Sequence, residues 1–231
     1  MDWQERSRRL IGEEKTNLLK KSSVLVCGLG GVGSFVAEAL ARSGVGRLDI
    51  LDFDKVAPSN INRQIPATSL TVGQYKADVL AERLLAINPE LKVVCHKTRL
   101  TEENIPLLLD NNKYDYIADA IDDLPAKTSL VSYAIKNNIP IISSMGAAFR
   151  LNPLKLNISD ISKTHTCPMA RRLRKALKDK GISEGLTVVW SDEQPVTPII
   201  KGTGPASMIF VPASAGLLMA SFIVKEIIKD R

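Results

Sequence analysis

A glycine-rich turn stands between a predicted buried strand and a predicted helix. The strand spans Ser23 to Gly28, the turn reads Gly28-Leu-Gly-Gly-Val-Gly33, and the helix spans Val32 to Ser43. Glycines allow backbone N–H groups to approach a phosphate at the positive end of the helix. The turn therefore predicts a nucleotide site, although a tight turn without a ligand is the alternative. The glycines expected at the phosphates are Gly28, Gly30, Gly31 and Gly33.

An acidic residue follows this turn at a spacing that suits ribose recognition. Asp52 lies 19 residues after Gly33, at the end of a second strand predicted over Arg47 to Leu51. In dinucleotide-binding folds, an acidic side chain at this place binds the ribose hydroxyls. The pattern up to this point fits an NAD-linked module as well as an ATP site.

Two cations favour the ATP site. Arg63 lies in a long polar loop, residues 54–71, and Lys76 lies in the first turn of a helix predicted over Val72 to Ile87. Such cations would hold the β- and γ-oxygens of a triphosphate and offset charge during attack at the α-phosphorus. For Lys76 the alternative is a solvated lysine. Neutral donors and acceptors in the loop are Asn60, Asn62 and Gln64.

A carboxylate stands just beyond a later strand, predicted over Tyr114 to Ala120. Asp122 is suited to hold Mg²⁺ through one carboxylate. The alternative is an N-cap of the helix predicted over Pro125 to Asn138, a role for which Asp123 competes. Asp122 is our candidate metal ligand.

Buried strands alternate with helices through the first half of the chain, which favours a mostly parallel, doubly wound α/β sheet of Rossmann-like type. Two later strands predict an antiparallel extension, and an apolar stretch predicts a buried C-terminal helix at a subunit interface, with membrane association as the alternative. We expect one domain, with an ATP-binding half over 1–145 and a substrate and dimer half over 146–231. The remaining predicted elements are a helix over 1–21, strands over Lys92–Thr98, Ile139–Ser144, Leu154–Ile158 and Leu186–Trp190, a helix from Thr101, a Pro/Gly loop over Gln194–Ser207 and the apolar helix over Met208–Val224.

The composition of the chain excludes several classes of protein. With 231 residues, 45% apolar and 24% charged, the chain is typical of a globular protein. Residues 1–20 lack the apolar core of a signal peptide, so a cytoplasmic protein is expected. The three cysteines are scattered singly, which indicates reduced thiols and excludes a four-cysteine zinc site.

The net charge of +6 is concentrated in one segment. Lys163 to Lys180 carries seven cations and one anion, so the rest of the chain sums to zero. On a helix, its apolar residues share one face and its cations cover the others. Phosphate contacts are the first explanation, since they give an RNA-binding protein its affinity. A solvated helix face is the alternative. The candidate RNA-binding residues are Arg171, Arg172, Arg174, Lys175 and Lys178.

Five motifs in this order resemble the ubiquitin-activating-type adenylyltransferases, the superfamily that includes ThiF. They are Gly28–Gly33, Leu51–Asp54, Asn60–Gln64, Gly73–Lys76 and Asp119–Asp123. The resemblance implies an ATP site that includes Asp54 and Gln64, with Asn60, Arg63 and Lys76 at the phosphates. Lys76, Arg63 and the magnesium-linked Asp122 would be catalytic. It also implies that Arg9 enters the ATP site of a dimer partner; a surface arginine is the alternative.

The second half resembles one branch of that superfamily, the tRNA threonylcarbamoyladenosine dehydratases. The similarity rests on residues 160–164, 168–174 and 202–207. It implies adenylation of the threonyl carboxylate of the modified base, ring closure and release of AMP. The partners implied are that tRNA and a second copy of the chain, with a sulfur-relay protein left open; neither DNA nor stable membrane insertion is expected. A rival is an adenylyltransferase for a ubiquitin-like sulfur carrier, against which the missing CxxC pairs count. Cys167 is expected to be incidental, with a reactive thiol as the alternative.

Overall fold

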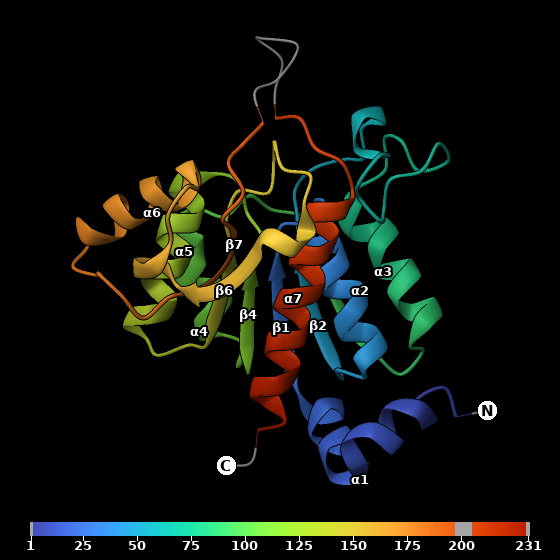
Figure 1. The fold of residues 1–231 in the computed structure, drawn as a ribbon. Coiled ribbons are helices and arrows are strands. Elements are labelled where there is room, and N and C mark those ends of the chain that lie inside the picture. The colour runs from blue at the N-terminus through green and yellow to red at the C-terminus, as the bar shows by residue number, and fades with distance from the viewer. Residues whose placement is uncertain (1, 197–204, 230–231) are drawn as a thin grey trace.

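A seven-stranded sheet lies between two layers of helices (Figure 1). The computed structural model describes residues 2–196 and 205–229. The strands are β1 (Ser23–Cys27), β2 (Arg47–Leu51), β3 (Lys92–His96), β4 (Tyr116–Asp119), β5 (Ile141–Ser144), β6 (Leu156–Asp160) and β7 (Thr187–Ser191). The α-helices are α1 (Glu5–Lys21), α2 (Gly33–Ser43), α3 (Lys76–Ile87), α4 (Asn104–Asp110), α5 (Leu124–Lys136), α6 (Pro168–Lys178) and α7 (Phe210–Ile227), and the short 3₁₀ turns are η1 (Pro58–Asn60), η2 (Pro153–Lys155) and η3 (Ile161–Lys163).

The strand order is β3-β2-β1-β4-β5-β7-β6, and every pair except β6–β7 is parallel. The predicted fold class is therefore confirmed, including the antiparallel extension. In the central register Cys27 pairs with Leu51 on one side and with Asp119 on the other. The residues that follow these three strands consequently meet at one edge of the sheet, where ligands bind in doubly wound folds.

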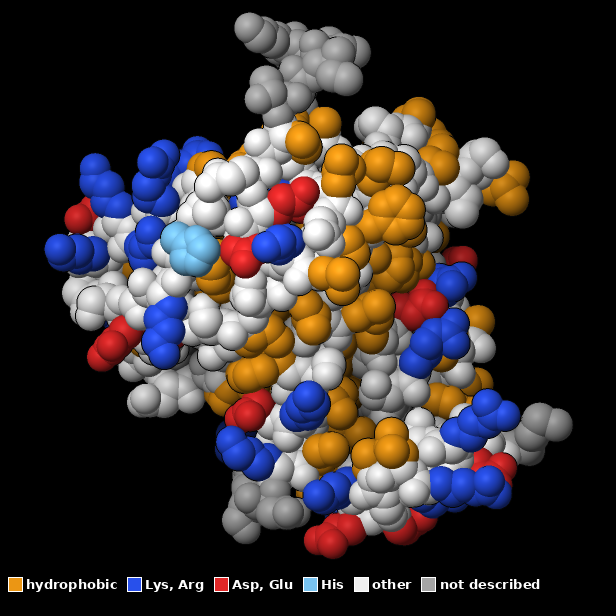
Figure 2. Space-filling model, in the orientation of Figure 1, with side chains coloured by type: hydrophobic (Ala, Val, Ile, Leu, Met, Phe, Trp, Pro, Cys, Tyr) orange, Lys and Arg blue, Asp and Glu red, His pale blue; other side chains and the backbone are white. Residues whose placement is uncertain are grey.

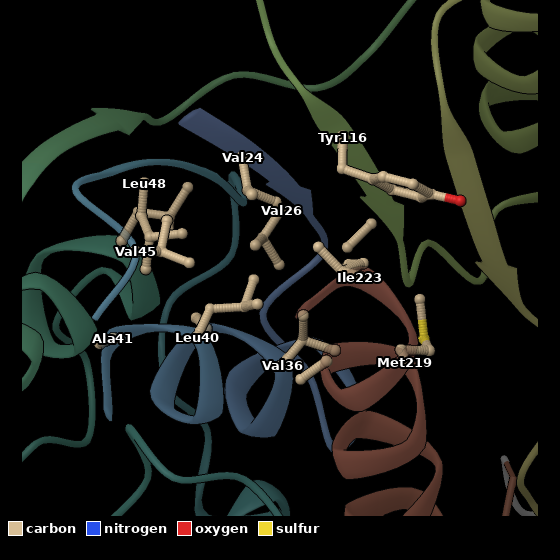
Figure 3. Close-up of a cluster of buried hydrophobic side chains, with 14 of the residues drawn as sticks. Val24, Val26, Val36, Leu40, Ala41, Val45, Leu48, Tyr116, Met219 and Ile223 are labelled. Atoms are coloured by element: carbon tan, nitrogen blue, oxygen red, sulfur yellow. The ribbon is translucent and has the colours of Figure 1, made fainter. Parts of the chain in front are cut away.

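Each face of the sheet has its own apolar core. Valines and leucines of β1, β2 and α2 pack against α7 on one face, as Figure 3 shows for Val26, Leu40 and Met219. The other core joins α4, α5 and α6 to the opposite face. β-branched residues suit strands that are covered on both faces. The two cores hold the carboxyl-end loops on a rigid base.

Two helices differ from the prediction near glycines. α3 begins at Lys76, four residues after the expected start, because Gly73 adopts φ 87° and Tyr75 is extended. α1 is broken at Gly12, whose φ of 85° and ψ of 166° are not helical. The polar loop therefore runs as far as Tyr75. Of the predicted loop Gln194–Ser207, residues 197–204 lie outside the described part of the chain.

α7 packs on α2 and the sheet, as predicted for a buried C-terminal helix. A Cβ at Gly216 would lie 2.5 Å from the carbonyl oxygen of Val32, so the two helices touch through their backbones. Within residues 2–196 and 205–229, α7 alone is long and apolar enough to cross a membrane. Its packing in the core in Figure 3 is that of a helix inside a folded domain. Its place at a subunit interface stays a prediction.

Candidate active site

A cavity of about 490 Å³ opens at the carboxyl ends of β1, β2, β4 and β5. Its wall combines segments that lie far apart in the sequence, from the glycine-rich turn to the start of α7. Most of the predicted site residues meet there. Those that line the cavity are Gly28, Gly30, Gly31, Asp52, Asp54, Asn60, Arg63, Gln64, Lys76 and Asp122.

The glycine-rich turn is shaped by two close approaches. Gly28 adopts φ 85°, and a Cβ there would lie 2.8 Å from the carbonyl oxygen of Ala120. A Cβ at Gly33 would lie 1.7 Å from the carbonyl oxygen of Gly28. Gly33 does not line the cavity; it lets α2 begin directly against the turn. The turn thus brings the N-terminus of α2 to the cavity, which favours an anion there.

Asp52 ties the end of β2 to the glycine-rich turn. One carboxylate oxygen accepts the backbone N–H of Leu29 at 2.7 Å, and the other accepts that of Asp54 at 2.8 Å. Burial raises the pKa of Asp52, an effect that the nearby Lys76 opposes. The carboxylate is therefore fixed at the cavity edge, where it can accept hydrogen bonds from hydroxyl groups.

Lys76 is buried, with 5% of its surface exposed, so the solvated alternative is wrong. Its Nζ lies 2.8 Å from Oδ2 of Asp54 and 4.0 Å from Oδ2 of Asp52. The two carboxylates offset the charge of the ammonium beside the cavity. A polyphosphate would compete with Asp54 for this cation, since charge-assisted hydrogen bonds are the strongest available to it.

The polar loop presents three further side chains. Asn60 accepts the backbone N–H of Ala57 at 3.0 Å, and Arg63 donates to the carbonyl oxygen of Ser59 at 2.9 Å. Oε1 of Gln64 is buried without a hydrogen-bond partner among the described residues. Buried polar atoms are rarely left unpaired. A ligand donor in the cavity would satisfy this acceptor, so the loop fits a nucleotide.

The β4–α5 loop separates the roles of two neighbouring aspartates. Asp123 is the N-cap of α5, accepts the backbone N–H of Ala126 at 3.2 Å and pairs with Arg99. The hydrogen bond from Arg99, with that from Ala126, lowers the pKa of Asp123. Asp122 is exposed at the cavity and has no ion pair or side-chain hydrogen bond in the described part of the chain. The capping alternative for Asp122 is therefore wrong.

This arrangement fits Mg²⁺ in a restricted sense. The described residues contain no group of three or more His, Cys, Asp or Glu side chains that could hold a metal. Mg²⁺, however, is commonly held by one or two carboxylates together with substrate phosphates and water. Asp122 offers one free carboxylate on the cavity wall.

Sequence reasoning missed two parts of the wall. Arg99 and Phe53 both line the cavity, with the guanidinium 5.5 Å from the ring centre. Both follow predicted strand ends, a signal that would have found them. The second part is an uncharged wall formed by residues 144–148 and Met169, which brings the first turn of α6 to the cavity.

The predicted RNA-binding residues lie on α6, and Figure 2 shows the cations gathered over this helix at upper left. Arg174 differs from the other four because it is partly buried and donates to the carbonyl oxygen of Thr164 at 2.8 Å. It holds the preceding segment in place. The four exposed cations are Arg171, Arg172, Lys175 and Lys178.

Neither Arg9 nor Cys167 lines the cavity. Arg9 belongs to α1, beyond the starting ends of the strands at the lower end of Figure 1, and pairs with Glu5. It does not reach the cavity of its own chain. Cys167 is buried, with 3% exposed, at the N-cap of α6. Burial agrees with an incidental cysteine.

Known proteins resemble this chain along almost its whole length. A tRNA threonylcarbamoyladenosine dehydratase of Bacillus subtilis is 43% identical over 97% of this chain and 94% of its own. Crystal structures of the E. coli tRNA N6-threonylcarbamoyladenosine dehydratase in complex with AMP and with ATP superpose with TM-scores of 0.93 and 0.92, at 36% identity, over 98% of this chain and 96% of theirs. A sulfur carrier protein adenylyltransferase of Thermus thermophilus is 36% identical, but over 62% of this chain and 51% of its own. The ThiF family model matches residues 4–230, and the chain belongs to the ThiF family.

Proposed function

We propose that this protein is an ATP-dependent tRNA threonylcarbamoyladenosine dehydratase. One observation carries the proposal: a single cavity joins a nucleotide-binding edge to an uncharged wall that ends at the basic helix α6. The near full-length similarity to dehydratases, one of them solved with ATP, supports the same activity. The match to the sulfur carrier adenylyltransferase covers only 62% of this chain.

The proposed nucleotide contacts follow the geometry of the cavity. Asp52 would accept the ribose hydroxyls, and the backbone of the glycine-rich turn would bind phosphate. Lys76 and Arg63 would contact the phosphates and stabilise the charge that develops at the α-phosphorus. A magnesium ion held by Asp122 would supply further charge neutralisation at the phosphate oxygens.

The proposed reaction has two steps. A threonyl carboxylate oxygen of the modified adenosine attacks the α-phosphorus of ATP, and pyrophosphate leaves. The carbamoyl nitrogen or oxygen of the same base then attacks the activated carbonyl carbon, and AMP leaves with the former carboxylate oxygen. The base has lost one water in total. Attack within one molecule has a high effective concentration, so no enzyme thiol is needed, in agreement with the burial of Cys167.

We further propose a cytoplasmic homodimer that binds the tRNA on the exposed cations of α6. Arg9 lies at the opposite end of its own sheet from the cavity. Arg9 can act at an ATP site only in a second copy of the chain, and this motivates the dimer. A sulfur-relay protein is a further candidate partner, and neither DNA binding nor membrane insertion is proposed.

The test is mass spectrometry of nucleosides from threonylcarbamoyladenosine-containing tRNA after incubation with the protein and MgATP. The expected result is a base lighter by one water, formed only with ATP and in step with AMP. Unchanged tRNA would overturn the proposal. Pyrophosphate exchange driven by a ubiquitin-like sulfur carrier ending in Gly-Gly would then establish the rival activity.

A further inference from the structure

A completely buried ion pair lies beneath the cavity. Lys127 of α5 and Asp119 at the end of β4 both have 0% exposure, and Nζ lies 2.6 Å from Oδ2. Lysine is almost never buried to this extent unless it is paired. The cavity wall includes neither side chain, so the pair lies outside the site described above.

Every donor of the Lys127 ammonium has a partner. Besides Asp119, Nζ donates to the hydroxyl of Ser143 at 3.0 Å and to the carbonyl oxygen of Ser144 at 3.1 Å. The hydroxyl of Ser143 in turn donates to Oδ2 of Asp119 at 2.6 Å. The Lys127 side chain therefore joins the ends of β4 and β5, the two strands that lead into residues 120–123 and 144–148 of the cavity wall.

The network continues to the residue before Asp122. Oδ1 of Asp119 accepts the backbone N–H of Ile121 at 3.1 Å. Asp119 is also in register with Cys27, the residue before the glycine-rich turn. The backbone N–H of Ala120 donates to the carbonyl oxygen of Cys27 at 2.8 Å. Asp119, which is paired with Lys127, thus supports the start of the β4–α5 loop from below.

The position of the Asp122 carboxylate depends on the backbone of this loop, because its side chain has no partner among the described residues. Its carboxylate makes no side-chain hydrogen bond or ion pair with the described residues, whereas Asp123 is fixed by Ala126 and Arg99. A buried ion pair seldom adds net stability over an apolar pair, because both charges lose their hydration. The geometry that it imposes is the better explanation for its presence.

We propose that Lys127 is a positioning residue for the MgATP site, which holds the β4–α5 loop so that the Asp122 carboxylate faces the phosphates bound by the glycine-rich turn. This inference rests on the proposed function, since it takes Asp122 as the magnesium-binding carboxylate. Residues that orient a metal ligand typically raise metal affinity by about 10- to 100-fold. Magnesium should therefore strengthen ATP binding less once Lys127 is replaced.

The experiment measures the ATP dissociation constant by calorimetry, with Mg²⁺ and with EDTA, and compares the ratio between variants. Lys127→Met removes the ammonium. The double variant Lys127→Met/Asp119→Asn also removes the unpaired buried carboxylate, so it keeps the test available if the single variant fails to fold. Leu130→Ala is the matched control, because Leu130 is fully buried on the same helix and its apolar side chain makes no hydrogen bond in this network.

The expected result is that the magnesium-dependent gain in affinity falls by about 10-fold or more in the folded Lys127 variants. The affinity in EDTA and the ratio for Leu130→Ala should stay near the wild-type values. A wild-type ratio in the folded double variant would overturn the inference and leave a purely structural ion pair. The proposed function fails separately, if wild-type protein with an intact magnesium effect leaves the tRNA base unchanged.

Discussion

Replacement of Lys76 by alanine tests the proposed phosphate site most directly. The ammonium is held between Asp54 at 2.8 Å and Asp52 at 4.0 Å, with 5% of the residue exposed. An ammonium and a phosphate oxygen that carry unit charges about 4 Å apart attract each other by about 4 kcal/mol at an effective dielectric constant of about 20. Loss of a comparable electrostatic stabiliser from an active site costs about 10²- to 10³-fold in turnover. Lys76→Ala should lower turnover by that factor.

The assay follows AMP release with threonylcarbamoyladenosine-containing tRNA under saturating MgATP. Lys113→Ala is the control, because Lys113 is an exposed lysine before β4, at the other end of the strand from the cavity. Lys76→Ala also leaves Asp54 unopposed near the phosphates, so adding Asp54→Asn to it should restore part of the ATP affinity. Turnover of Lys76→Ala within threefold of Lys113→Ala would refute the assignment of this lysine to the phosphates.

Three further expectations concern other parts of the site. Asp122→Ala should reduce turnover by about 10²- to 10³-fold without loss of folded protein, and near-normal turnover would remove it from the mechanism. Because burial raises the pKa of Asp52, its ionised form is lost at a higher pH than that of an exposed aspartate. ATP affinity measured by calorimetry should fall as the pH is lowered through that pKa. The Asp52→Asn variant should bind ATP more weakly, with an affinity that does not change over the same pH range. The substitution Arg172→Gln should reduce the slope of log affinity for tRNA against log salt concentration by about 0.7–0.9 per lost phosphate contact. Arg174→Gln should instead chiefly lower the melting temperature, because Arg174 holds Thr164 in place. An unchanged slope after all four exposed α6 cations are replaced would reduce them to a solvated face.

Strand-end residues were the predictable part of this site. The apolar run of β1 and the positions of Asp52 and Asp122 after strands were enough to place them at one edge, because parallel strands in register bring their carboxyl ends together. The alternation of strands and helices likewise predicted the doubly wound sheet. These inferences depend on local periodicity and on general rules of chain connection.

Contacts between loops were beyond such reasoning. The burial of Lys76 depends on Asp54, which reaches it across a loop of more than 20 residues. Whether Asp122 or Asp123 caps α5 is decided by the extended backbone of Asp123, with ψ 111°, and the sequence offers two aspartates with equal claims. The partner of Arg99 could not be foreseen for the same reason, since it comes from a different loop.

The segments that line the cavity lie far apart in the sequence, and this links nucleotide binding to folding. The cavity wall includes the turn after β1, the loops after β2, β4 and β5, and the first turn of α7. No fragment that lacks one of these elements therefore contains the complete site. ATP should then bind the native chain far better than any partly folded form. A ligand with that preference adds about 2.7 kcal/mol to the free energy of unfolding at a concentration of about 100 times its dissociation constant. The cellular ATP supply would thus act on this protein as a stabiliser as well as a reactant, and the melting temperature should rise with ATP concentration.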